Sequence, residues 1–431
     1  MGNRQTARPS SGLLRERNLR LLFAAEASTV LGSRMTPIAL SFAVLESGGG
    51  ASGVGLVLGA QVAPAMVFLL VGGVFADRWG RRVTMIGSDL TSSMVGLIVV
   101  ALLLTTGLPI AGFVAFAVLL GITSAFFTPA LYGILPELVT GSRLQEANGL
   151  RSTINSVGSL LGPALGGALV AFTSPVWAIA IDALTYLLSA WLIFKLRVKQ
   201  PTHISRPKDE SFWRQLRDGW QEFSSRTWLW SLLLYTSLTC TLVLGPVMVL
   251  GVVLVGGEGG AHQWGIVMAA DGAGAILGGL AGMRLTFRRP LLASVFCTFG
   301  LGAFAVMLAV RMPVYVLVAG ALLSGAGFAL LSILWTSCLQ VDVPTETLSR
   351  VSAYDGVATV LCMTLGYLWA APAAAWAGAA QVLWLGAAWT VLSSVVMLAV
   401  PVIRRQWPLS KSSEPAERST LVPSAHENLA S

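Results

Sequence analysis

Long apolar runs are the feature that most constrains what this chain of 431 residues can fold into. A helix needs about 20 consecutive apolar residues to cross the hydrocarbon layer of a bilayer. Every backbone N–H and C=O in lipid must be bonded within the segment, so such a run is helical. Charged residues make up only 11% of the sequence, against about 25% in soluble domains. We therefore predict an all-α polytopic membrane protein, which excludes a soluble enzyme.

The apolar runs and the charged segments between them predict twelve transmembrane helices in two pseudo-symmetric bundles of six. The expected spans are 21–45, 54–76, 83–105, 109–131, 151–173, 175–195, 229–255, 262–284, 290–310, 312–335, 351–373 and 380–403. The domains then follow as a cytoplasmic tail 1–20, a first bundle 21–195, a cytoplasmic linker 196–228, a second bundle 229–403 and a disordered cytoplasmic tail 404–431.

Basic residues predict the orientation of these spans. If the spans alternate in direction, all 28 lysines and arginines except Arg34 and Arg311 fall on the side that holds both termini. Arg151, at the edge of the fifth span, is counted with this majority. Cytoplasmic segments carry such an excess of positive charge, so we expect a plasma-membrane protein with both termini in the cytoplasm. The net charge of +8 then reports orientation and leaves no basic face for nucleic acid.

Other chemistries lack the residues that they need. None of the four lysines follows a glycine, so the GxxxxGK[ST] phosphate loop is missing and ATP hydrolysis by that loop is excluded. The four cysteines form no CxxC pair and the three histidines are scattered, so no metal site is expected. Neither HExxH nor GxSxG occurs. We expect no enzyme, no metal and no cofactor.

The two halves of the chain resemble each other. Residues 55–61 (GLVLGAQ) resemble residues 265–271 (GIVMAAD), and the stretch 136–148 resembles the stretch around 348–352. Parallel six-helix repeats place a substrate cavity between the halves near the midplane, and rocking opens the cavity to each side in turn. The repeat favours a transporter over a receptor or a structural protein.

The loop between the second and third spans reads GVFADRWGRR. Glycines permit a tight turn, arginines hold the loop at the cytoplasmic face, and the aspartate offers a carboxylate to a neighbouring helix. The loop resembles the signature G-x-x-x-D-R-x-G-R-R/K of the major facilitator superfamily. The matching residues are Gly73, Asp77, Arg78, Gly80, Arg81 and Arg82. The resemblance implies that Asp77 meets the N-terminal end of the eleventh span, whose N–H groups favour an anion, and stabilises the outward-facing state.

The fifth span carries the sequence GSLLGPALGG, in which glycines recur every four residues and form one smooth helix face. Pro163 removes the hydrogen bond to the Ser159 carbonyl and favours a bend. The stretch resembles the antiporter motif of superfamily exporters. The matching residues are Gly158, Gly162, Pro163, Gly166 and Gly167. The chain as a whole is similar to the drug:proton antiporter branch, which includes macrolide-efflux and enterobactin-export proteins. Its Ser33 and Ser93 stand where that branch often has an acid and an arginine.

Charged residues inside the spans are the candidates for proton coupling or substrate contact. They are Glu26, Arg34, Asp89, Asp182 and Asp271. A charge in the membrane is costly and should face a cavity or a partner. Burial disfavours the charged form of a carboxyl group and a nearby cation favours it, so one acid can exchange a proton between two conformations. Arg34 could meet an anionic substrate group or hold an acid ionised, and structural ion pairs or helix capping remain alternatives. Asp355, in the first turn of the eleventh span, is expected to stabilise a helix dipole.

These features together predict a secondary active transporter. We expect proton-coupled efflux of a small amphipathic organic compound, such as an antibiotic, drug or siderophore, by alternating access. The proton gradient supplies the energy, and the partners are the lipid bilayer and the substrate, with the protein as a monomer. The alternative is an importer or symporter of a small nutrient or metabolite.

The loop signature generates a test. Replacing Asp77→Asn should lower transport several-fold without lowering the amount of protein in the membrane, because the amide loses the negative charge but keeps the shape of the side chain. Transport in cells and the membrane level of the protein would be measured together. Unchanged transport would remove Asp77 from the mechanism.

Overall fold

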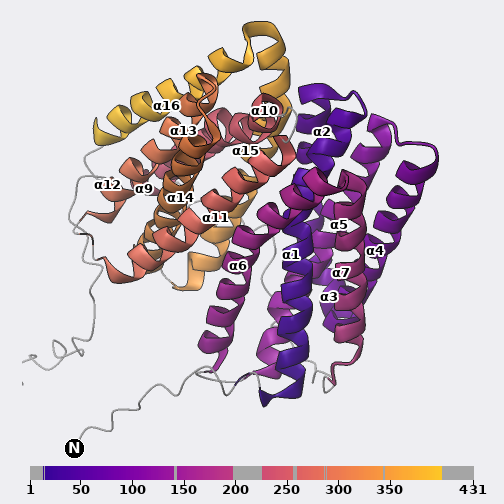
Figure 1. Ribbon diagram of the computed structural model, residues 1–431. Coiled ribbons are helices and arrows are strands. Elements are labelled where there is room, and N and C mark those ends of the chain that lie inside the picture. The colour runs from indigo at the N-terminus through magenta and orange to yellow at the C-terminus, as the bar shows by residue number, and fades with distance from the viewer. Residues whose placement is uncertain are drawn as a thin grey trace, which may run out of the picture.

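The computed structural model describes residues 13, 15–139, 143–197, 226–255, 260–285, 287, 289–342 and 345–399, and nearly all of them are helical (Figure 1). The first half contains α1 (Arg17–Glu46), α2 (Gly50–Val62), α3 (Pro64–Trp79), α4 (Arg81–Thr105), α5 (Ile110–Leu138), α6 (Arg143–Phe172) and α7 (Pro175–Phe194). The second half contains α9 (Thr227–Thr239), a π-helix η2 (Cys240–Leu244), α10 (Gly245–Val255), α11 (Gly260–Arg284), α12 (Pro290–Cys297), α13 (Phe299–Ala309), α14 (Val314–Asp342), α15 (Thr345–Ala377) and α16 (Ala379–Ala399).

The all-α membrane fold predicted from the sequence is confirmed. Eleven helices of the described residues are long and apolar enough to cross a bilayer. The span expected at 54–76 is instead two shorter helices, α2 and α3, which meet at Ala63. Pro64 has no N–H for the helical hydrogen-bond ladder, so the helix is interrupted there. A count of twelve spans stays a prediction.

Several helices extend beyond the apolar runs that predicted them. α6 begins at Arg143 and α15 at Thr345, several residues before the expected starts. The expectation that Asp355 lies in the first turn of its helix is therefore wrong. Its carboxylate accepts a hydrogen bond from the indole N–H of Trp335, 3.2 Å away, on α14. Nearly all of the linker 196–228 and the whole of the tail 404–431 lie outside the described residues.

The helices form two groups that lie side by side (Figure 1). In the first, α1 packs against α6 and α7, and α4 packs against α5 and α7. In the second, α14 packs against α11, α12 and α13, and α16 packs against α13. Apolar side chains fill the interior of both groups, including Phe113, Phe116, Phe304 and Trp264, and each is almost fully buried.

The two groups meet mainly along two helix pairs, α6 with α11 and α2 with α15. A Cβ added at Gly167 of α6 would lie 2.6 Å from the Cα of Gly265 on α11. A Cβ at Gly59 of α2 would lie 3.1 Å from the side chain of Leu368 on α15. The sequence repeat relates α2 to α11 and the fifth-span helix α6 to α15. The repeat therefore relates the α6–α11 interface to the α15–α2 interface, as pseudo-twofold symmetry requires.

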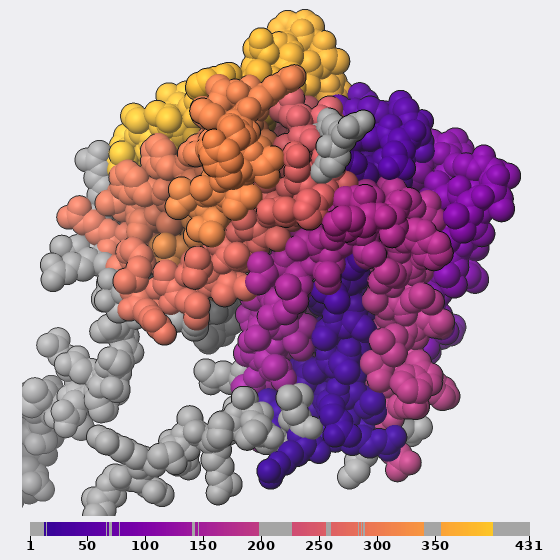
Figure 2. Space-filling view, viewed as in Figure 1, coloured from indigo at the N-terminus to yellow at the C-terminus, as the bar shows by residue number. Residues whose placement is uncertain are grey.

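Both interfaces lie toward one end of the molecule. We call the end at which α1 begins the proximal end and the opposite one the distal end. The residues in contact, 159–167 on α6 and 261–272 on α11, belong to the distal and middle parts of these helices. Figure 2 shows the two groups adjoining at the distal end and diverging toward the proximal end. Among the described residues, the two groups are therefore in contact distally and apart proximally.

Exposed aromatic side chains mark two levels along the helices. Trp177, Tyr315, Trp376 and Trp384 lie at the distal end, and Trp79, Trp191 and Trp230 lie at the proximal end. Tryptophan and tyrosine concentrate at the two membrane–water interfaces because their rings are apolar and their tips are polar. The two levels fit a helix bundle that spans a bilayer.

The distal closure generates a test. A valine at Gly265 should push α6 and α11 apart, because its side chain meets the α6 backbone, and overpacking of this kind destabilises a contact by about 1–3 kcal/mol. Gly279→Val on the same helix is the matched control, since nothing lies within 4 Å of a Cβ there. Spin labels at positions 172 and 262, in a background without the native cysteines, should report longer distances only for Gly265→Val. Equal distances in both variants would contradict this role for Gly265.

Candidate functional site

Helix α6 presents two faces of small residues to two different helices. Gly158, Gly162 and Gly166 lie against Val30, Arg34 and Met35 of α1. Ser159, Pro163 and Gly167 face α11, where Gly265 and Gly272 receive them. Small residues let helix backbones approach closely. The predicted glycine face thus packs within the first group, and a second face, one residue further along, packs between the groups.

The proline of this helix has a consequence at the interface. Pro163 carries no N–H, so the carbonyl of Ser159 loses its usual partner four residues later. That carbonyl lies against Gly272 of α11, at the position where a Cβ would be in any other residue. A glycine presents a Cα–H there, and Cα–H···O=C contacts of this kind recur between closely packed helices. The carbonyl freed by Pro163 therefore contacts the opposite half of the molecule.

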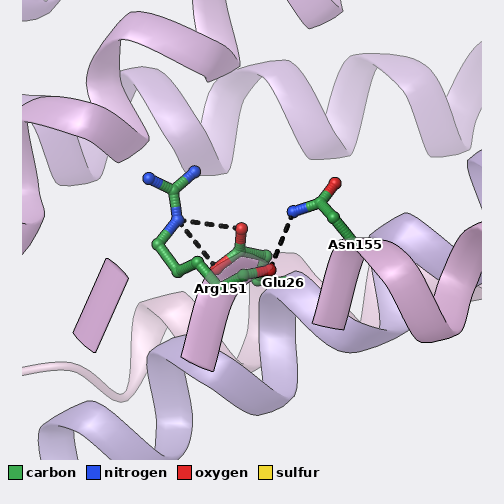
Figure 3. Close-up of polar contacts among 3 residues, drawn as sticks. All are labelled: Glu26, Arg151 and Asn155. Carbon is green, nitrogen blue, oxygen red and sulfur yellow. Dashed lines mark hydrogen bonds and ion pairs between the residues drawn. The ribbon is translucent and has the colours of Figure 1, made fainter. Parts of the chain in front are cut away.

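A buried ion pair joins α1 and α6 on the proximal side of the glycine face. The Nε of Arg151 lies 2.9 Å and 3.2 Å from the two carboxylate oxygens of Glu26 (Figure 3). The amide of Asn155, one turn along α6, donates to the same carboxylate (Figure 3). Glu26 is only 2% exposed and Arg151 8%. Two hydrogen-bond donors and one full positive charge thus surround the Glu26 carboxylate.

The ion pair forms part of the wall of a cavity of about 460 Å³ in the first group. Helices α1, α4, α5, α6 and α7 all contribute to its lining. The Arg151 guanidinium lies over the ring of Tyr132, with its carbon 4.4 Å from the ring centroid. Phe127 and Leu131 add an apolar wall, and Arg34 and Asp89 add charged groups. A cavity with this mixture of apolar and polar lining suits a small amphipathic molecule.

Asp89 on α4 lines this cavity and Asp182 on α7 lies behind it, and each is 2% exposed. Asp182 accepts a hydrogen bond from the Thr36 hydroxyl, which connects it to α1. The Oδ2 atom of Asp89 has no hydrogen-bond partner among the described residues. Tyr186 lies near both acids and lines the cavity. The two carboxyl groups therefore have different surroundings, one hydrogen-bonded to α1 and one partly unsatisfied.

Asp271 is not brought to this cavity. It lies on α11 in the second group, and its carboxylate accepts a hydrogen bond from Ser324 on α14. Glu26, Arg34 and Asp89 line the cavity together, with Asp182 directly behind them. The structure thus brings four of the five charged candidates together at one cavity, which lies in the first half.

The loop between α3 and α4 is held mainly by its arginines. Gly80 has a φ of +97°, a backbone conformation that favours glycine. Arg82 donates to the carbonyls of Ile193, at 3.1 Å, and Phe194 at the C-terminal end of α7. Arg81 donates to the Gly133 carbonyl and pairs with Glu137 at 2.8 Å on α5. These arginines therefore connect α4 to α5 and α7.

The other residues of this loop contribute less to the described contacts. Arg78 is exposed. Gly73 has room for a side chain, since the nearest atom to its added Cβ is 3.9 Å away, on Pro129. The side chain of Asp77 lies outside the described part of the chain, as do the side chains of residues 345–354 at the start of α15. The predicted contact of Asp77 with the eleventh span therefore lies outside the described residues.

Sequence reasoning missed the partner of Glu26. From the sequence, Arg151 is expected among the residues that orient the protein at the cytoplasmic side. That assignment is wrong, because α6 begins two turns before the expected start of the span and places Arg151 in the cavity wall. A signal was present in the spacing. Arg151 and Asn155 precede Gly158 by seven and three residues, which places them on the same face of the helix as the glycines. Tyr132 and Tyr186, which also line the cavity, gave no signal of their own.

The structure has two helix groups, an interface between them that is closed at one end, and a polar cavity among the membrane-spanning helices. These features define the class of protein as a membrane transporter. The chain belongs to the Major Facilitator Superfamily, whose family model matches residues 22–367. It is a transporter and not an enzyme, as the sequence predicted.

Similar proteins agree with this assignment. The macrolide efflux protein A of Streptococcus pyogenes is 23% identical, over 89% of this chain and 94% of that protein. The multidrug efflux pump Tap of Mycolicibacterium fortuitum is 30% identical over 42% of this chain and 45% of its own length. The crystal structure of the nucleoside transporter NupG superposes with a TM-score of 0.69, over 89% of this chain and 98% of that one, at 12% identity. The last of these shows the fold alone.

The arginine contacts generate a test of stability. Arg82→Gln should lower the free energy of unfolding by about 1–2 kcal/mol, because two carbonyls at the end of α7 lose a charged donor. Arg78→Gln is the control, since Arg78 is exposed and makes no hydrogen bond among the described residues. Thermal unfolding of the purified protein in detergent measures both variants. If both variants lost the same amount of unfolding free energy, the effect would come from the removed charge alone and not from the hydrogen bonds of Arg82.

Proposed function

We propose that this chain is a proton-coupled exporter of a small amphipathic organic compound, working by alternating access. The observation that carries the proposal is the buried Glu26–Arg151 ion pair, which joins α1 to α6 in the wall of the cavity. The relatives named for macrolide and multidrug efflux support export. No cofactor and no ATP enter this scheme, in which the gradient of protons supplies the energy.

The ion pair is suited to carry the proton because its two partners lie on different helices. In this proximally open state Arg151 and Asn155 surround the Glu26 carboxylate and favour its ionised form. When the interface at α6 and α11 opens distally, a shift of α6 along α1 separates Arg151 from Glu26. A buried carboxylate without its cation is strongly disfavoured, so Glu26 then takes a proton from outside. Return to the present state restores the pair and releases the proton.

The orientation of the cycle follows from the distribution of charge. Of the described basic side chains, Arg311 lies at the distal end, Arg34 and Arg151 line the cavity, and the others lie at the proximal end. The side richer in lysine and arginine is cytoplasmic in multi-pass proteins. In the proposed cycle the proximal opening faces the cytoplasm, with both termini on that side, and the protein works as a monomer in the plasma membrane. In this state the cavity takes its cargo from inside the cell.

Cargo is found first by growth inhibition of cells with and without the protein on a panel of antibiotics and other amphipathic compounds. Each compound that the protein protects against is then added to inside-out vesicles that hold an imposed pH gradient, with a pH-sensitive dye to report the gradient. Export coupled to protons should collapse the gradient on addition of the compound. Transport out of intact cells that persists without a proton gradient would overturn the coupling. Accumulation of the compound inside intact cells would instead favour the importer or symporter.

Glu26 generates the sharpest prediction. Glu26→Gln should lower proton-coupled transport at least about tenfold and flatten its dependence on pH, because the amide cannot exchange a proton. Glu137→Gln is the matched control, since Glu137 forms its ion pair with Arg81 outside the cavity. Transport rates of both variants across a range of pH, with equal protein in the vesicles, make the comparison. A Glu26→Gln variant that keeps the pH dependence of the unaltered protein would place the proton site elsewhere.

A further inference from the structure

Some charged groups of the cavity have a partner of opposite charge and others have none among the described residues. Glu26 and Arg151 neutralise each other at 2.9 Å. The second guanidinium of the lining, that of Arg34, makes no hydrogen bond or ion pair with any described side chain. Arg34 is nevertheless held firmly at its base, because Gly162 of α6 packs against its Cβ atom. One positive charge therefore lines the cavity without a partner among the described residues.

Asp89 is the other charged residue in the lining, and it does not neutralise Arg34. Its carboxyl group is 2% exposed, and one oxygen has no hydrogen-bond partner among the residues described. No ion pair connects it to Arg34. A buried carboxylate with neither a cation nor a full set of hydrogen bonds is strongly disfavoured in its charged form. The cavity of this state therefore carries a net positive charge at Arg34.

We propose that the cargo carries a carboxylate or a similar oxyanion group, which the Arg34 guanidinium binds. This inference rests on the proposed function and specifies the chemical class of its cargo. A guanidinium binds such a group through two parallel N–H···O bonds, a geometry that gives specificity as well as affinity. Phe127, Leu131 and Tyr132 face the same cavity and receive the apolar part of the molecule. Cargo with a basic amine is disfavoured, because it adds a second positive charge beside Arg34.

The charge of the cargo also affects the energetics of export. With Glu26 paired to Arg151 and an anion paired to Arg34, the charges of the loaded cavity are balanced when it crosses between states. Balanced charges reduce the cost of closing a cavity within the low dielectric of the membrane. The membrane potential, negative inside, also drives an anion outward. An amphipathic acid is thus the cargo that both the cavity and the direction of export favour.

The test compares three probes that share one fluorescent group and differ in charge. Dansylglycine is an anion, dansylglycinamide is neutral and dansylcadaverine is a cation. Each is titrated against the full-length protein in nanodiscs, with the change in dansyl fluorescence as the measure of binding. We expect dansylglycine to bind at least about tenfold more tightly than dansylcadaverine and several-fold more tightly than dansylglycinamide.

Variants assign this preference to Arg34. Arg34→Gln should bring the three affinities within about twofold of one another, and Arg34→Lys should keep their order with a smaller margin, because the ammonium keeps the charge and loses the paired geometry. Arg143→Gln is the matched control, since Arg143 pairs with Glu16 outside the cavity. A large gain in dansylglycine affinity in Asp89→Asn would show that Asp89 neutralises Arg34, and it would overturn the inference.

The outcomes separate this inference from the proposed function. Equal binding of the three probes, binding of none, tightest binding of the cation, or an anion preference that survives Arg34→Gln in a correctly folded protein overturns the inference. Binding in nanodiscs needs no gradient, so it is independent of proton coupling. Preference for the anion together with transport that ignores the proton gradient would overturn the proposed coupling and leave the cargo class standing.

Discussion

The close contact of α6 with α1 on one face and with α11 on the other is the interaction on which the rest of the structure depends. Glycines on the first face bring Arg151 of α6 within hydrogen-bond distance of Glu26 on α1. Gly167 and the Ser159 carbonyl on the second face meet α11 and close the distal end. One helix therefore couples the cavity wall to the interface between the halves. Since lipid offers no hydrophobic force between helices, this coupling relies on small residues that allow close backbone contact.

The low dielectric of the membrane explains how the few charges inside it are arranged. Glu26 is matched by Arg151 and Asn155, and Asp182 by the Thr36 hydroxyl. Arg34 and Asp89 are the exceptions, and both line the cavity. Unmatched charge is tolerated where a cavity or a ligand can solvate it. The two exceptions therefore lie at the cavity where we propose that cargo binds.

The sequence predicted the fold class and the charged candidates better than it predicted their partners. The apolar runs indicated the helices, and Glu26, Arg34 and Asp89 stood out because they interrupt those runs. Arg151 did not stand out, because the polar start of α6 separates it from the apolar run. Only its spacing from Gly158 indicates that it lies on the glycine face of the helix. The break at Ala63 and the depth of Asp355 in α15 were also missed. Hydropathy indicates which residues of a helix lie in lipid. It does not predict the helical turns that extend beyond the lipid.

The sequence by itself determined that the chain spans a membrane as helices, that its halves resemble each other and that a few charged residues interrupt its apolar runs, since each of these follows from composition, period and local motif. Tertiary structure alone decided which charges meet. Glu26 and Arg151 are far apart in the chain and become partners only when α1 and α6 pack, and Asp271 is separated from them because α11 turns it toward Ser324. An ion pair depends on distances between helices, and helix packing sets those distances.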